Sequence, residues 1–195
     1  MVQGLFPDNT VLCNFAAVER LDLLRDWLRG RGRWTEAVEH EAGLSSGHLP
    51  ALREVLDGGW LGEAIEVFDD DVEKIRRHAF GGPTAQPRKH LGEAQTCVLI
   101  LNHAEFAGSW WLSDDTDAVE YAQRRGITTY RTIDMAALGV HRFLRAVEPG
   151  TPGASRSSWW PRWLPRCCWP GRPARIRRAW WRLAVPLLAR DCWRW

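Results

Sequence analysis

The sequence is poor in the residue patterns that build metal clusters, disulfide frameworks and membrane spans. Its five cysteines are an odd number without zinc-binding spacing, which argues against both a zinc site and a disulfide framework. No apolar run approaches the length of a membrane-spanning helix, and no signal peptide opens the chain. We therefore expect a protein of the reducing cytoplasm with no membrane partner.

Histidine and net charge are also sparse. The six histidines show neither ligand spacing nor a nucleophile partner, so we expect them at the surface. The formal charge of +2 hides a division of the chain: residues 151–195 hold ten Arg and one acid, a net charge of +9, so the first 150 residues carry −7. The first part is predicted to be an acidic globular domain, and the last part differs from it in kind.

What the first part does contain is an alternation of short strands and helices. Strands are predicted over residues 5–7, 60–67, 109–113 and 127–130, with a short edge strand at 33–35. Helices are predicted over residues 11–16, 20–28, 36–42, 49–56, 69–80, 91–103, 118–125 and 133–147. This alternation is typical of βαβ units, and it predicts an α/β protein with helices on both faces of a parallel sheet.

The stretch over residues 5–16 is the most informative. An apolar start runs into Asp8, and apolar residues then recur at helical spacing, which predicts a strand, an acidic turn and an amphipathic helix. In an open α/β sheet this junction is the carboxyl end of a strand, where ligands bind. Asp8 is therefore either a helix N-cap or part of a site, and the cap is favoured until other carboxylates join it.

Further acids follow the strand at residues 109–113: Asp114, Asp115 and Asp117. Because parallel strands end at one edge, these carboxylates can converge with Asp8, and Glu93 and Glu41 lie near helix ends. Clustered carboxylates raise one another's pKa unless a divalent cation neutralises them. Oxygen ligands without His or Cys suit Mg²⁺ or Mn²⁺, which could activate a water and stabilise the departing oxygen of a phosphodiester. Taken singly each acid is a cap or a solvated charge; the ordered set favours a metal site.

Three short motifs stand in a fixed order: LFPDNTVL at residues 5–12, LGEA at 91–94 and WLSDDTDA at 111–118. In this order they resemble the PIN-domain proteins, the family of the VapC-type ribonuclease toxins. The continuation AQRRGI at residues 122–127 is similar to the last helix and strand of that family. The resemblance covers about residues 3–146.

The resemblance implies a three-layer α/β/α domain over residues 1–147 and a Mg²⁺- or Mn²⁺-dependent endoribonuclease site. The first family Asp falls on Asp8, the mid-chain acid on Glu93, and the late acids on Asp114 or Asp115 with Asp117. Asp8, Glu93 and Asp115 would then be catalytic, and Glu41 resembles the second acid of the family. The implied partners are an RNA substrate, a small antitoxin protein and a second copy of the chain.

Two features favour an alternative, a catalytically degenerate PIN-like binding module. Pro7 stands where the family has an apolar strand residue, and proline removes a donor from the ladder of a sheet. The net charge of −7 is also poor for attracting RNA, because phosphate contacts usually come from Lys and Arg.

The tail over residues 148–195 holds eight of the thirteen Trp residues together with Arg, Pro and Cys. It could be an RNA-binding arm, in which Trp stacks on bases and Arg contacts phosphates, or a membrane-surface segment, although its prolines forbid one continuous helix. We favour a third interpretation, that GC-rich DNA read in a shifted frame encodes it and that it is disordered or loosely collapsed.

Truncation after Pro149 tests this interpretation of the tail. We expect the truncated protein to equal or exceed the full chain in thermal stability and in RNA cleavage, because an accidental segment contributes to neither. Lost cleavage with an unchanged melting temperature would instead identify a functional RNA-binding arm.

Overall fold

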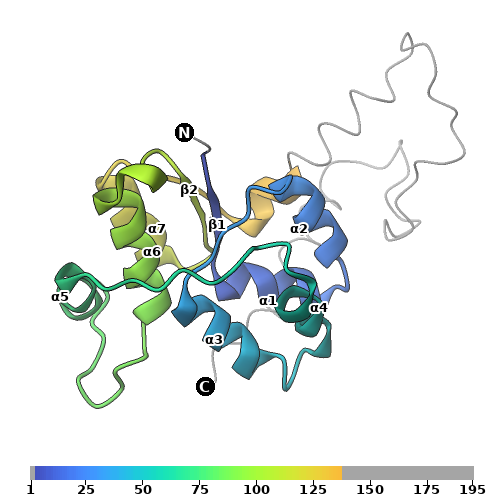
Figure 1. Cartoon of the computed structure of the whole chain (residues 1–195), viewed down its shortest axis with the longest axis horizontal. Coiled ribbons are helices and arrows are strands. Elements are labelled where there is room, and N and C mark those ends of the chain that lie inside the picture. The colour runs from blue at the N-terminus through green and yellow to red at the C-terminus, as the bar shows by residue number, and fades with distance from the viewer. Residues whose placement is uncertain (1–2, 138–195) are drawn as a thin grey trace, which may run out of the picture. The chain divides into compact units, whose positions relative to one another are not determined.

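The computed structural model describes residues 3–137, which form a mixed α/β unit with a parallel sheet (Figure 1). The tail predicted over residues 148–195 lies outside the described residues. A helix begins at residue 132, where one was predicted from residue 133, and its predicted end at residue 147 also lies outside them. No helix among the described residues is long and apolar enough to cross a membrane.

The elements follow one another as β1 (Leu5–Pro7), α1 (Asn9–Ala17), α2 (Leu21–Leu28), α3 (Glu36–Ser45), the 3₁₀ turn η1 (Pro50–Leu52), α4 (Arg53–Gly58), α5 (Asp70–His78), α6 (Leu91–Asn102), the 3₁₀ turn η2 (Ala104–Phe106), β2 (Trp110–Leu112), α7 (Thr116–Arg124) and β3 (Thr128–Tyr130). The strands pair in the order β1-β2-β3, and both pairings are parallel. The carboxyl ends of all three strands therefore share one edge of the sheet.

Successive strand residues face opposite sides of the sheet, as the two-residue period of a strand requires. Leu5 and Leu112 join a cluster with buried side chains from α1, α2, α3 and α4. Phe6 and Trp111, which are register partners, join a second cluster with buried side chains from α6 and α7. A one-residue slip of β1 would exchange these faces, so the apolar pattern fixes the register that places Asp8.

Pro7 fits the sheet because its missing N–H would face away from β2. The Leu5 N–H donates to Arg31 O at 2.9 Å, and the Arg33 N–H donates to Leu5 O at 2.9 Å. Since residues two apart in a strand point their backbone groups the same way, the nitrogen of Pro7 faces that side too. The next residue, Asp8, donates its N–H to Leu112 O at 2.8 Å, so the proline removes no bond between β1 and β2.

Helix ends account for much of the local structure. Asp69 is the N-cap of α5 and accepts from the Asp71 N–H at 2.8 Å. The first turn of α5 is acidic and its last turn basic, which suits the helix dipole. Gly126, at φ +79°, follows the C-cap of α7 in the left-handed conformation that glycine adopts readily at this position.

Two predicted strands are wrong. Residues 60–67 contain a single bridge, between Ile65 and Thr35, and residues 33–35 contribute only that bridge. The apolar alternation failed because Gly62, at φ +74°, turns the chain before a ladder can form. The helix predicted over residues 36–42 runs further than expected, because α3 continues to Ser45. Because these two predicted strands are absent from the sheet, the strand that precedes Asp114 and Asp115 is β2, the middle strand of three.

Candidate functional site

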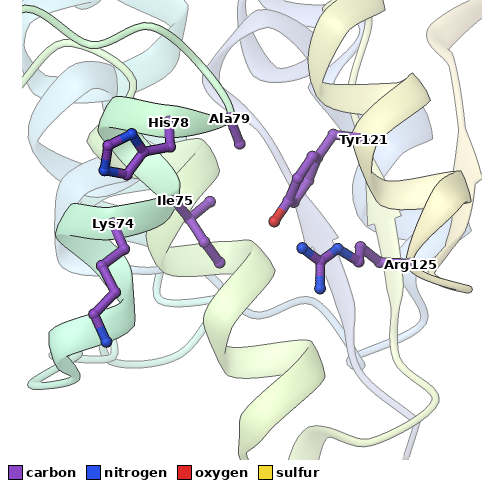
Figure 2. Close-up of a pocket in the computed structure, with 6 residues that line it drawn as sticks. All are labelled: Lys74, Ile75, His78, Ala79, Tyr121 and Arg125. Carbon is purple, nitrogen blue, oxygen red and sulfur yellow. The ribbon is translucent and has the colours of Figure 1, made fainter.

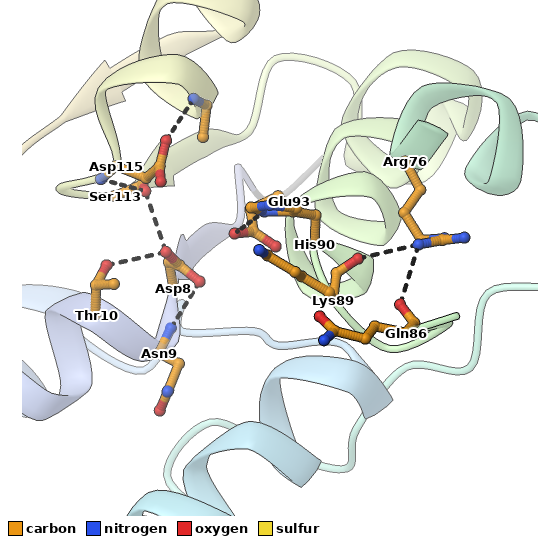
Figure 3. A network of polar contacts seen from close by, with 11 residues as sticks. Asp8, Asn9, Thr10, Arg76, Gln86, Lys89, His90, Glu93, Ser113 and Asp115 are labelled. Carbon is orange, nitrogen blue, oxygen red and sulfur yellow. Dashed lines mark hydrogen bonds and ion pairs between the residues drawn. The ribbon is translucent and has the colours of Figure 1, made fainter. Parts of the chain in front are cut away.

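The neighbouring ends of β1 and β2 bring Asp8 and Ser113 together. Asp8 follows β1 directly and is the N-cap of α1, so the cap interpretation is confirmed. Ser113 follows β2, is fully buried, and donates its hydroxyl to Asp8 Oδ2 at 3.1 Å (Figure 3). The Asp115 N–H donates to the same Ser113 oxygen at 3.2 Å. Ser113 therefore links the two acidic turns.

Asp8 is a buried carboxyl group with ample hydrogen bonding. Only 3% of it is exposed, and besides Ser113 it accepts from the Asn9 N–H at 2.8 Å and the Thr10 hydroxyl at 2.9 Å. Burial and the nearby Glu93 charge nevertheless raise the pKa of Asp8 to about 7, because they outweigh these bonds. A helix cap does not need a carboxylate that is buried next to another acid, since Asn or Ser would also cap the helix.

Glu41 and Glu93 approach the same place from α3 and α6. Burial, then the charges of Asp8 and Glu93, raise the pKa of Glu41 to about 9. The two helices come close at Gly92, where a Cβ would lie 3.0 Å from Val38 Cγ2 and 3.3 Å from Glu41 Oε1. A glycine at this position lets α6 bring Glu93 toward the acid of α3.

His90 corrects the expectation that all histidines lie at the surface. It precedes α6 in the left-handed conformation, at φ +61°, and is partly buried. Its Nδ1 lies 3.3 Å from Glu93 Oε1, and this hydrogen bond raises the pKa of His90 against the effect of burial. A fixed imidazole thus accompanies the carboxylates, and the spacing of histidines in the sequence gave no signal for it.

The late acids separate into three environments. Asp115 is buried, caps α7 by accepting from the Ala118 N–H at 2.8 Å, and acts electrostatically on His90. Asp114 accepts from Asn14 Nδ2 at 2.7 Å and from the Thr132 N–H at 2.9 Å, which ties β2 to other segments of the chain. Asp117 is exposed in the first turn of α7.

The predicted acids are therefore only partly brought together. Asp8, Glu41 and Glu93 interact electrostatically, and Asp115 joins them through Ser113. Sequence reasoning missed Ser113, Thr10 and His90. A hydroxyl next to each strand-end acid, Thr10 two residues after Asp8 and Ser113 just before the double Asp, was the available signal for the first two.

A shallow pocket of about 270 Å³ lies elsewhere, between α5 and α7 (Figure 2). It is lined by Lys74, Ile75, His78, Ala79, Tyr121 and Arg125. Tyr121 contacts Phe80 edge-on, with ring centroids 5.2 Å apart, and the Arg125 guanidinium lies 5.2 Å from the Tyr121 ring. None of the predicted carboxylates lines this pocket.

The donor set fits a hard divalent cation in its chemistry, since it consists of carboxylate oxygens that repel one another when ionised. Within residues 3–137, however, no three His, Cys, Asp or Glu side chains already stand at the positions a metal ion requires. Cation binding would therefore draw the carboxylates closer. No protein-family model, curated protein or solved structure matches the chain.

Proposed function

We propose that the protein is a Mg²⁺-dependent endoribonuclease of the PIN type, with Mn²⁺ as the substitute ion. The observation that carries the proposal is that Ser113 joins Asp8 and Asp115 at neighbouring strand ends, while the close approach of α3 and α6 at Gly92 brings Glu93 toward Glu41. Burial and the nearby carboxylate charges raise the pKa values of Asp8 and Glu41. Buried carboxyl groups with such raised pKa values lower the stability of the folded protein, and groups of this kind are typical of functional sites. A divalent cation bound between them would relieve their repulsion.

Asp8, Glu93 and Asp115 would hold the ion, with Glu41 at the second-acid position. The ion supplies Lewis-acid stabilisation of phosphodiester oxygens and a more acidic water. Hydroxyl donors from Thr10 and Ser113 orient the Asp8 carboxylate, as outer hydrogen bonds do for metal-binding carboxylates. Asp114 is a structural link in this proposal, since its hydrogen bonds to Asn14 and Thr132 tie it to α1 and to the segment after β3.

The proposal includes a three-layer PIN fold. Helices cover both faces of the sheet, which supports the three-layer PIN arrangement, although the sheet has only three strands. A toxin role, a small antitoxin partner, a second copy of the chain and a cytoplasmic location follow from the resemblance of motifs.

One observation favours the alternative, a PIN-like binding module without catalysis. In the described part of the chain no three ligating side chains already form a metal-binding group, so the carboxylates are not preorganised around an ion. Preorganisation is what makes a metal site catalytically effective, and a module that only binds RNA or protein would not need it.

Purified full-length protein incubated with single-stranded RNA in Mg²⁺ or in EDTA distinguishes these proposals. We expect cleavage in Mg²⁺, its loss in EDTA and its return when excess Mn²⁺ is added. An exposed-residue variant on α2, Asp26→Asn, should cleave like the wild type. RNA that stays intact in both ions, with binding retained, would replace the nuclease proposal by the binding module.

A further inference from the structure

A buried arginine fixes the loop over residues 81–89 beside the carboxylates. Arg76 lies on α5 and is 1% exposed, and its Nη1 contacts the carbonyl oxygens of Pro83, Gln86 and Lys89, each at 3.3 Å (Figure 3). Its Nε and Nη2 donate to the Glu73 carboxylate at 2.7 and 2.9 Å. One guanidinium thus holds both ends of the loop.

The loop passes closely over this guanidinium at Gly82. A Cβ at that residue would lie 2.5 Å from Arg76 Nη1 and 3.0 Å from Arg76 O. The Gly82 N–H also donates to Arg76 O at 2.9 Å. A side chain at residue 82 would displace the Arg76 guanidinium, so glycine favours the close contact between the loop and the arginine.

The last residue of this loop brings a cation to the rim of the carboxylates. Lys89 is exposed, and among the described residues no carboxylate lies within salt-bridge distance of its ammonium group. Lys89 immediately precedes His90, whose Nδ1 lies 3.3 Å from Glu93 Oε1, and the charge of Lys89 acts on that histidine (Figure 3). A basic side chain without a salt bridge among the described residues thus adjoins the histidine that contacts Glu93.

Lys89 differs from the other basic side chains near it in having no salt bridge among the described residues. The chain has only two lysines, and the other, Lys74, is bound to Asp71 at 2.7 Å on α5. Arg88, the neighbour of Lys89, lies 3.3 Å from Glu36 of α3 and is already paired. An unpaired cation at the edge of a carboxylate site is suited to a ligand that is itself anionic.

We infer that Lys89 binds a backbone phosphate of single-stranded RNA next to the carboxylate cluster, and that Arg76 positions it by holding the loop. This inference rests on the proposed function and adds a residue that contacts the substrate. A lysine acts as a point charge toward phosphate, so the contact secures the strand without reading its sequence. It also supplies local attraction that the net charge of the domain does not.

The test measures the binding of a fluorescein-labelled single-stranded oligoribonucleotide to the full chain in EDTA. Fluorescence anisotropy gives the Kd at several KCl concentrations. We expect Lys89→Gln to weaken binding about 3- to 10-fold and to lower the slope of log Kd against log salt by about 0.7, one phosphate contact. Lys89→Arg should restore both values. Lys74→Gln is the matched control and should bind like the wild type, so equal Kd values for the two Gln variants would overturn the inference.

Arg76 is tested by a double-mutant cycle in the same assay. Arg76→Lys keeps the charge but loses the planar fork, so we expect it to weaken RNA binding about as much as Lys89→Gln, and the double variant to lose little more. Additive losses would show that Arg76 does not act through Lys89. Thermal melting followed by circular dichroism checks that each variant is folded. If Arg76→Lys is unfolded, the Lys89 variants still test the phosphate contact.

The outcomes separate this inference from the proposed function. Binding that depends on Lys89 without cleavage in Mg²⁺ would leave the phosphate contact standing and remove the nuclease. Cleavage in Mg²⁺ with identical binding by Lys89→Gln and Lys74→Gln would do the reverse. Absence of any RNA binding by the wild type would overturn the Lys89 contact directly.

Discussion

Asp8→Asn is expected to slow metal-dependent RNA cleavage strongly and to raise the melting temperature at about pH 8. A metal ligand supplies several kcal/mol of transition-state stabilisation, so we expect cleavage to fall by at least about 100-fold. The melting temperature rises because Asn removes a buried charge that Glu93 opposes. Its amide still accepts from the Asn9 N–H, and it can donate to the rotatable hydroxyls of Thr10 and Ser113.

The measurements are single-turnover cleavage and thermal melting by circular dichroism, with the exposed Asp26→Asn as the control. If Asp8 were only a helix cap, Asn would replace it with little change, because Asn and Asp cap helices about equally well. Unchanged cleavage and an unchanged melting temperature together would therefore contradict the proposed site. A loss of both activity and stability would point to a purely structural role.

The second large effect is a fall in stability with rising pH when no metal is present. The pKa values of Asp8 and Glu41 are raised to about 7 and about 9 from ordinary values near 4. Between about pH 4 and pH 9 the folded chain therefore retains protons that the unfolded chain has lost. Each retained proton lowers the free energy of unfolding by about 1.4 kcal/mol per pH unit, so stability is greatest at acidic pH.

We expect the melting temperature in EDTA to drop by on the order of 10 °C from about pH 5 to about pH 8. Mg²⁺ should raise it more at the higher pH, because the ion binds ionised carboxylates and displaces their protons. Glu41→Gln should flatten the profile in EDTA, whereas Asp26→Asn should leave it as in the wild type. A melting temperature that climbs steadily through this pH range in EDTA would show that these carboxyl groups are not under repulsion.

The fold was predictable where short-range chemistry decides it. The apolar run before Asp8, the capping position of that residue and the glycine after α7 are local signals, and the structure follows them. The failure at residues 60–67 has a different cause, because apolar alternation does not reveal that Gly62 turns the chain. Strand pairing needs a partner at the right place, and pattern alone does not supply one.

In the candidate site, too, the features set by local sequence were predictable and those set by contacts between distant residues were not. Parallel-strand geometry predicts that Asp8 and the β2 acids share an edge, but it cannot choose between Asp114 and Asp115. The choice depends on Asn14 and Thr132, which are far from Asp114 in sequence and bind it in space. Arg76 is a second example. A basic residue is expected in the last turn of a helix such as α5, but the sequence does not indicate that the loop after α5 buries this side chain.

The hydrogen bond between Ser113 and Asp8 joins residues that are 105 positions apart. During synthesis a domain emerges from its N-terminus, so Asp8 leaves the ribosome long before β2 exists to pair with β1. Ser113, Asp115 and Trp111, the register partner of Phe6, all belong to that late segment. The growing chain therefore carries an incomplete carboxylate cluster until β2 and the residues after it have been synthesised.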